Sequence, residues 1–121
     1  MGLSEDLFRK TIKLSSNEFN PTVKTIIADI LKVTKGVKVY VFGSVARNEA
    51  TTNSDLDILF VFSNLENISE IQKQFYRTKT LLQTEVDIVF KTEDTLNNSD
   101  SIFLDAVKDE LKEVYPNWTL N

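Results

Sequence analysis

The sequence predicts an α/β (α+β) fold, a small mixed sheet of about three or more strands with helices packed on one face. Three observations lead to this prediction. The length of 121 residues is typical of one domain, so residues 1–121 are treated as a single unit. Short segments rich in β-branched and aromatic residues alternate with longer segments of helical periodicity. Glycine (3) and proline (2) are scarce, which predicts short connections between neighbouring elements.

The first two helices precede any strand. Ser4 can cap a short helix that runs to about residue 14, and residues 1–19 form an N-terminal helical extension. This extension can cover the domain's own core or meet a partner. The pair Asn20-Pro21 is a typical helix start, with Asn20 as the capping residue and Pro21 in the first turn. Apolar residues at helical spacing continue this second helix to Leu31.

Strands and helices then alternate to the end of the chain. The middle strand, DLDILFVF, is apolar on both faces after its two aspartates, which places it centrally in the sheet. The last helix is expected to end before Pro116. Trp118, close to the C-terminus, can fill the core or anchor a partner. The expected strands are 37–42, 55–62 and 85–90, with helical turns at 44–48 and helices at 67–83 and 99–114.

The chain contains no histidine and no cysteine. The absence of cysteine excludes a disulfide framework, an iron–sulfur cluster and a thiol nucleophile. The absence of histidine excludes a Ser-His-Asp triad, a histidine-ligated zinc ion and an imidazole base. Any catalysis therefore relies on carboxylates, hydroxyls, amines, backbone groups or a metal ion bound by oxygen.

The net charge and the lengths of the apolar runs indicate whether the protein binds nucleic acid or a membrane and in which compartment it works. The net charge is -4, which disfavours direct binding to nucleic acid. The longest strongly apolar run, 58–62, is far too short to cross a bilayer, so no membrane association is expected. The N-terminus has no apolar run of signal-peptide length, so we expect a cytoplasmic protein.

Gly43 and Ser44 directly follow the first strand and open a helical turn. Glycine lets the backbone turn sharply and approach a ligand closely. The start of a helical turn offers free N–H groups and a partial positive charge, which favour a phosphate. The Ser44 hydroxyl adds a further donor. The alternative interpretation is that Gly43 and Ser44 form an ordinary structural turn without a ligand.

Asp55 and Asp57 are two residues apart on a strand, so both carboxylates leave the same face. Carboxylate oxygens are suited to Mg²⁺, which also keeps phosphate and water in its shell. Asp87 lies on the next expected strand and faces away from its apolar neighbours, so it can join the other two. A third carboxylate would serve as metal ligand and proton acceptor in a chain without histidine.

The segment VFGSVARNEATTNSDLDILFVF resembles the signature of the DNA polymerase beta nucleotidyltransferase superfamily, in which Gly-Ser, ten residues and Asp-x-Asp follow one another. The segment EVDIVF resembles the later strand that supplies the third carboxylate. The small size resembles the minimal nucleotidyltransferases (MNT) of prokaryotes. The resemblance covers residues 37–115, the expected catalytic core.

The resemblance implies a role for each matching residue. Gly43 and Ser44 would hold the triphosphate of ATP, Asp55 and Asp57 would bind two Mg²⁺ ions, and Asp87 would bind the second ion and accept the proton of the nucleophile. Arg47 matches the second basic position of the family's Gly-Ser-x-Ala-Arg pattern. The alternative interpretation is that Arg47 is an ordinary surface residue of a helix. Val45 and Asn48 depart from the family's usual arginine and glycine.

The resemblance also implies an activity and a partner. Minimal nucleotidyltransferases resemble the antitoxin half of a toxin–antitoxin pair, in which AMP is transferred from ATP to a tyrosine of a HEPN-domain ribonuclease toxin. We therefore expect a protein adenylyltransferase that forms a hetero-oligomer with such a toxin. Two alternatives stay open. One is an adenylyltransferase that acts on a small molecule such as an antibiotic, and the other is an antitoxin that binds its partner without catalysis.

Overall fold

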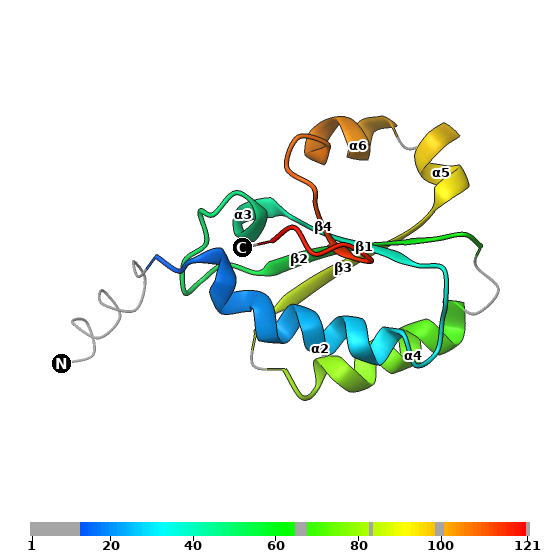
Figure 1. Cartoon of the computed structure of the whole chain (residues 1–121), viewed down its shortest axis with the longest axis horizontal. Helices are drawn as coiled ribbons and strands as arrows, with labels where there is room; N and C mark the ends of the chain where they lie inside the picture. Colours follow the sequence, from blue (N-terminus) through cyan, green and yellow to red (C-terminus); the bar gives the residue numbers. More distant parts are fainter. Residues whose placement is uncertain (1–12, 65–67, 83, 99–100, 121) are drawn as a thin grey trace.

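The sheet has four strands in the order β3-β2-β1-β4. The computed structural model describes residues 13–64, 68–82, 84–98 and 101–120 (Figure 1). β1 pairs antiparallel with β2 and with β4, whereas β2 and β3 are parallel, so the expected mixed sheet of an α/β fold is confirmed. The elements are η1 (Ser16–Phe19), α2 (Asn20–Ile30), β1 (Lys38–Phe42), α3 (Gly43–Ala46), β2 (Leu56–Phe62), α4 (Ile68–Lys79), β3 (Val86–Thr92), α5 (Glu93–Asn98), α6 (Ser101–Val107) and β4 (Lys112–Tyr115).

The main core lies between the sheet and the pair α2 and α4, which pack side by side beneath it in Figure 1. Alternate residues of β2 point into this core, because side chains of a strand alternate between its two faces. Phe60 is fully buried and stacks on Phe90 of β3, with 5.7 Å between the ring centroids. β2 thus lies between β1 and β3, as the apolar run over 55–62 predicts. The buried side chains of β2 in this core are Leu56, Ile58, Phe60 and Phe62.

The prediction of a helix over 99–114 is wrong in its second half. α6 ends at Val107, and Lys112–Tyr115 forms β4, which pairs antiparallel with β1. The spacing of Val107, Leu111 and Val114 fits one face of a helix, but Val114 is also a β-branched residue at the centre of a short edge strand. The free backbone groups of β1 satisfy those of β4, and this long-range pairing outweighs the local helical pattern.

The N-terminal part differs from expectation in two ways. The helix expected near residues 4–14 lies almost wholly outside the described residues, and Lys13 instead pairs with Thr51 in an isolated bridge. α2 does begin at Asn20, but its N-cap is Phe19 and no side chain caps it, because η1 leads directly into it. The buried Asn20 Oδ1 has no hydrogen-bond partner among the described residues.

The C-terminal segment returns along α2. Trp118 is 36% exposed and lies under the ammonium of Lys24, 5.1 Å from the ring centroid. Leu120, by contrast, is 5% exposed and belongs to the main core. Leu120, rather than Trp118, therefore fills the core from this segment.

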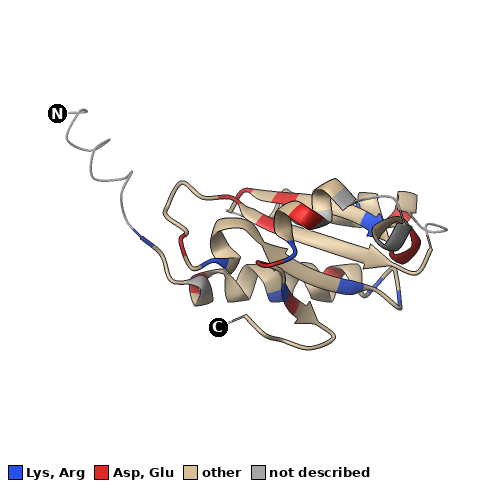
Figure 2. Ribbon diagram, turned by 90° about the horizontal axis from the view of Figure 1, so that it is seen from above, with Lys and Arg blue, Asp and Glu red and all other residues tan. Residues whose placement is uncertain are grey.

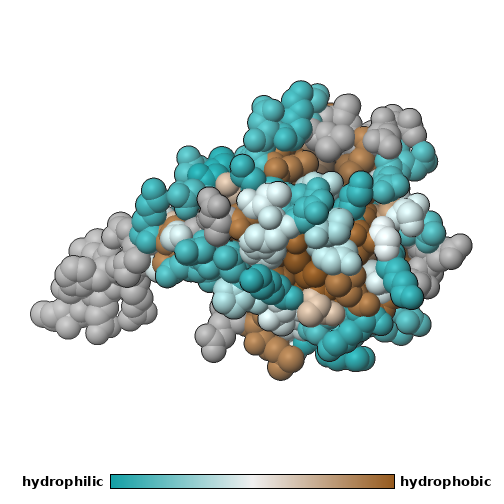
Figure 3. Space-filling model, in the orientation of Figure 1, coloured by the Kyte–Doolittle hydropathy of each residue, from teal (hydrophilic) through white to brown (hydrophobic). Residues whose placement is uncertain are grey.

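α5 and α6 lie on the opposite side of the sheet from α2 and α4 (Figure 1). Phe103 of α6 meets Phe42 edge-on, with 5.7 Å between ring centroids. Beside these helices, a groove of about 440 Å³ is lined by Tyr40 and Leu59 of the sheet and by Leu96 of α5. Apolar atoms reach the surface at the level of the sheet in Figure 3. The second face of the sheet, on which the sequence predicts no helices, is thus partly covered.

Charged residues of both signs are interspersed over the side of the molecule seen in Figure 2. This distribution agrees with the modest net charge of -4. Within the described part of the chain, no helix is both long enough and apolar enough to cross a membrane.

Candidate active site

Gly43 is the residue at which β1 turns into α3. Its φ of +75° lies in the left-handed region, where glycine is favoured over other residues. A Cβ atom on this residue would overlap Oδ2 of Asp57 and lie 3.1 Å from its Cγ. The turn therefore approaches the Asp57 carboxylate so closely that only glycine fits. Ser44 follows on α3 and is half-buried.

The three predicted carboxylates come from two neighbouring parallel strands. Asp57 and Asp87 are direct partners in the register of β2 and β3. Asp55 precedes the first residue of β2 by one position, on the same side as Asp57 by the alternation of a strand. Asp57 is half-buried, whereas Asp55 and Asp87 are exposed. The parallel pairing thus brings Asp87 beside the Asp-x-Asp pair, as the sequence predicts.

Burial and neighbouring charges both act on the Asp57 carboxyl group. Burial raises the pKa of Asp57 above its ordinary value, and the charges of Asp87, Asp55 and Glu110 raise it further, while Arg47 lowers it. Like charges disfavour the ionised form of a carboxyl group, and a bound cation relieves this repulsion. The site is therefore a concentration of negative charge that is suited to receive a cation.

The donor set fits a hard divalent ion. All candidate ligands are carboxylate oxygens, which Mg²⁺ prefers over nitrogen and sulfur. Among the residues that the structure describes, no three acidic side chains converge closely enough to enclose an ion. Mg²⁺ needs no such cage, because proteins commonly hold it by one or two carboxylates together with substrate phosphates and water.

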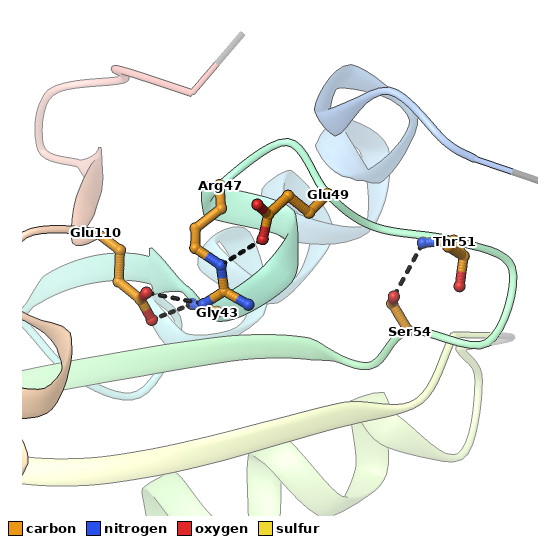
Figure 4. Close-up of polar contacts among 6 residues, drawn as sticks. All are labelled: Gly43, Arg47, Glu49, Thr51, Ser54 and Glu110. Atoms are coloured by element: carbon orange, nitrogen blue, oxygen red, sulfur yellow. Dashed lines mark hydrogen bonds and ion pairs between the residues drawn. The ribbon is translucent and has the colours of Figure 1, made fainter.

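One residue that the sequence analysis did not single out, Glu110, lies at the Gly43 turn. Glu110, in the turn between α6 and β4, accepts a hydrogen bond from the Gly43 N–H (2.9 Å) and one from Arg47 Nη1 (2.8 Å), as Figure 4 shows. Arg47 also donates from Nε to Glu49 (2.7 Å). Arg47 is exposed at the surface and pairs with both of these carboxylates.

These contacts determine the charge of Glu110. Burial raises the pKa of the Glu110 carboxyl, but the hydrogen bonds from Arg47 and Gly43 and the charge of Arg47 outweigh burial, so the pKa lies below its ordinary value. Glu110 is thus an anion beside the Gly43 turn. No local pattern pointed to it, because it lies 67 residues beyond Gly43 in a segment that was expected to be helical.

The loop before Asp55 is closed by its own hydrogen bonds. Ser54 Oγ accepts from the Thr51 N–H (2.9 Å), and the Ser54 N–H donates to the Thr51 carbonyl (3.0 Å). Two separate surface hollows lie near the candidate carboxylates. A hollow of about 320 Å³ includes Asp55, and one of about 230 Å³ includes Asp87 and Tyr76. Neither hollow is lined by Asp57 or Gly43, so the two hollows give open surface beside Asp55 and Asp87 and do not enclose the whole candidate site.

The chain matches the nucleotidyltransferase domain family over residues 22–113. A relative from Methanocaldococcus jannaschii, named for an inferred protein adenylyltransferase activity, is 32% identical over 96 residues, which are 78% of this chain and 96% of that protein.

Two solved structures share the fold. An inferred nucleotidyltransferase from Sulfolobus solfataricus superposes with a TM-score of 0.59 at 23% identity, covering 88% of this chain and 90% of that chain. A complex of an MNT antitoxin with a tri-AMPylated HEPN toxin from Shewanella oneidensis gives a TM-score of 0.53 at 17% identity, covering 84% of this chain and 73% of the matched chain. Because the family match spans most of the residues that build the sheet and its carboxylates, this chain belongs to the nucleotidyltransferase domain family and is a nucleotidyltransferase enzyme.

Proposed function

We propose that this protein is a Mg²⁺-dependent adenylyltransferase that transfers AMP from ATP to a tyrosine hydroxyl of a cognate HEPN ribonuclease toxin, and so acts as the antitoxin of that pair. The observation that carries the proposal is the register of β2 and β3, which pairs Asp57 with Asp87 beside the Gly43 turn. The name of the Methanocaldococcus relative and the AMPylated toxin in the Shewanella complex support AMP as the group and a toxin as the acceptor.

In this proposal the chain's own residues bind the nucleotide and handle the proton. The Gly43 N–H and the Ser44 hydroxyl hold the triphosphate, with Arg47 beside them. Asp55, Asp57 and Asp87 hold two Mg²⁺ ions, which supply charge stabilisation for the phosphate oxygens when bound. These roles follow from the chemistry of the donors and from the family resemblance.

The reaction is a substitution at the α-phosphorus of ATP. The tyrosine oxygen forms a bond to this phosphorus, the bond to the bridging oxygen of pyrophosphate breaks, and pyrophosphate leaves. The proton of the tyrosine hydroxyl passes to the Asp87 carboxylate, which is exposed and therefore accessible to an acceptor. A carboxylate takes this role because the chain has no histidine.

The proposed acceptor comes from a partner protein. The described domain is a single sheet with its helices, and both hollows beside the carboxylates are open to the surface. A tyrosine on a partner's surface can reach Asp87 from the side of β3, which is an edge strand of the sheet. We also propose that the complex forms in the cytoplasm.

The test is a transfer reaction with the protein encoded beside this chain's gene. Incubation with ATP and Mg²⁺ should add the mass of AMP to a tyrosine of that neighbour, as mass spectrometry would detect. The double variant Asp55→Asn, Asp57→Asn should abolish the modification, whereas Asp105→Asn, which removes an exposed acid from α6, should not. Modification that persists in the double variant would refute the proposed metal site. A neighbour left unmodified by a chain that binds Mg-ATP would refute the proposed acceptor.

A further inference from the structure

The Gly43 turn already holds an anion that belongs to the chain itself. One carboxylate oxygen of Glu110 accepts the Gly43 N–H at 2.9 Å, and the other accepts from Arg47 at 2.8 Å (Figure 4). The proposed function assigns the Gly43 N–H to the triphosphate of ATP and places Arg47 beside it. Glu110 therefore engages the same two donors that a nucleotide would use.

A carboxylate and a phosphate compete for such donors. Both are oxyanions, and both form their strongest hydrogen bonds with charged or backbone N–H donors. The single Gly43 N–H cannot serve two oxyanions at full strength, and two anions held at one turn repel each other. A triphosphate that reaches this turn must therefore push the Glu110 carboxylate aside.

We propose, on the basis of the proposed function, that Glu110 occupies the phosphate position of the nucleotide site and sets the affinity for ATP, because it has to be displaced before the triphosphate can bind. Glu110 is then an affinity-determining residue of the reaction that lies outside the family's Gly-Ser and Asp-x-Asp motif. Its carboxylate takes no part in the chemical step.

The surroundings of Glu110 support displacement by the side chain alone. The backbone is fixed, since the Glu110 N–H donates to the Val107 carbonyl (2.9 Å) and β4 begins two residues later. The Glu110 side chain is 19% exposed, so it borders solvent and can swing outward. Glu110 also adds negative charge beside Asp57, and this charge opposes an incoming nucleotide as well.

A competing interpretation is that Glu110 only ties the turn between α6 and β4 to α3. This interpretation makes the opposite prediction for nucleotide binding. If the contact only maintains the shape of the site, its removal should loosen the Gly43 turn and weaken the binding of ATP. If the carboxylate competes with the nucleotide, its removal should strengthen binding.

The experiment measures the affinity for Mg-ATP by isothermal titration calorimetry, without an acceptor protein, for the wild type, Glu110→Ala and Glu110→Gln. We expect about tenfold tighter binding by Glu110→Ala, which corresponds to about 1.4 kcal/mol. Glu110→Gln loses the charge but keeps the size of the side chain, which still has to be displaced. Its affinity for Mg-ATP should therefore rise as well, but by less than that of Glu110→Ala. Thermal unfolding of each variant verifies that the fold is retained.

Glu49→Gln is the matched control. Glu49 also pairs with Arg47, at 2.7 Å, and Figure 4 shows it on the opposite side of this residue from Glu110. Its side chain is 64% exposed, so solvent screens its charge more strongly. We expect the affinity of this variant to stay within about threefold of the wild type.

The outcomes separate the two proposals. Unchanged or weaker binding by folded Glu110→Ala and Glu110→Gln, with normal binding by the wild type, would overturn the role of Glu110 alone. An equal gain from Glu49→Gln would also overturn it, because general loss of negative charge would then suffice. Absence of Mg-ATP binding by all four proteins would overturn the proposed function and this inference with it.

Discussion

Replacing Gly43 by alanine tests how the turn and the carboxylates depend on each other. Gly43 has a φ of +75°, and an added Cβ would overlap Oδ2 of Asp57. The same Cβ would lie 3.1 Å from Cγ and 3.4 Å from Cβ of Asp57, so rotation of the carboxylate alone does not clear the space. Either Asp57 or α3 has to move. We therefore expect Gly43→Ala to lose both stability and the geometry of the site.

The magnitude has two parts. The left-handed backbone costs an alanine about 1–2 kcal/mol. The overlap with Asp57 resembles overpacking of a filled site, which costs about 1–3 kcal/mol. Together, the free energy of unfolding should fall by about 2–5 kcal/mol.

Gly36→Ala is the matched control, because Gly36 also has a positive φ, +69°, but has room for a Cβ, which would make an ordinary contact with Ser63 Oγ at 3.8 Å. At Gly36 only the cost of the left-handed backbone applies, so the free energy of unfolding of this variant should fall by about 1–2 kcal/mol. Its nucleotidyl transfer should be retained. Urea denaturation measures both stabilities, and Mg-ATP calorimetry with the transfer assay measures the site. Equal losses of stability in the two variants, or full transfer by Gly43→Ala, would refute the argument.

Two further predictions concern stability. Burial and neighbouring charges such as that of Asp87 raise the pKa of Asp57, so its ionised form destabilises the folded state. The contribution of Asp57 to the free energy of unfolding should therefore fall as pH rises through this raised pKa, whereas Asp29 and Glu110, whose pKa values are lowered, contribute with the opposite sign. Urea denaturation across about pH 3–8 should show Asp57→Asn gaining stability relative to the wild type as pH rises; a difference in the free energy of unfolding that stays the same at every pH would contradict this. Buried Thr78 donates to Asp29 (2.7 Å) between α2 and α4, so Thr78→Val should lose about 1–2 kcal/mol in the same assay, whereas exposed Thr80→Val should lose less than about 0.5 kcal/mol.

Much of the site was predictable because its signals are local. The alternation of a strand places Asp55 and Asp57 on one side without knowledge of any neighbour. Gly43 directly follows a strand and precedes a helical turn, and both elements were evident from neighbouring residues. The position of Asp87 required one further step, the pairing of two strands connected by a helix, which favours a parallel neighbour.

The missed features depend on distant partners. Lys112–Tyr115 became a strand because β1 offered it an unpaired edge, and no pattern within the segment announces that edge. Glu110 reaches Gly43 and Arg47 only because β4 pairs with β1 and carries the preceding turn to the start of α3. One error in the secondary structure therefore concealed a residue of the site.

The sequence by itself determined the alternation of helices and strands, the central apolar strand and the identity of the acidic residues, because each depends on neighbours within a few positions. The absence of histidine also determined that a carboxylate has to act as the base in the proposed reaction. Only the tertiary structure decided that Glu110 faces the Gly43 turn. That contact spans 67 residues, and its geometry follows from the order and register of the strands, which long-range hydrogen bonds and packing select.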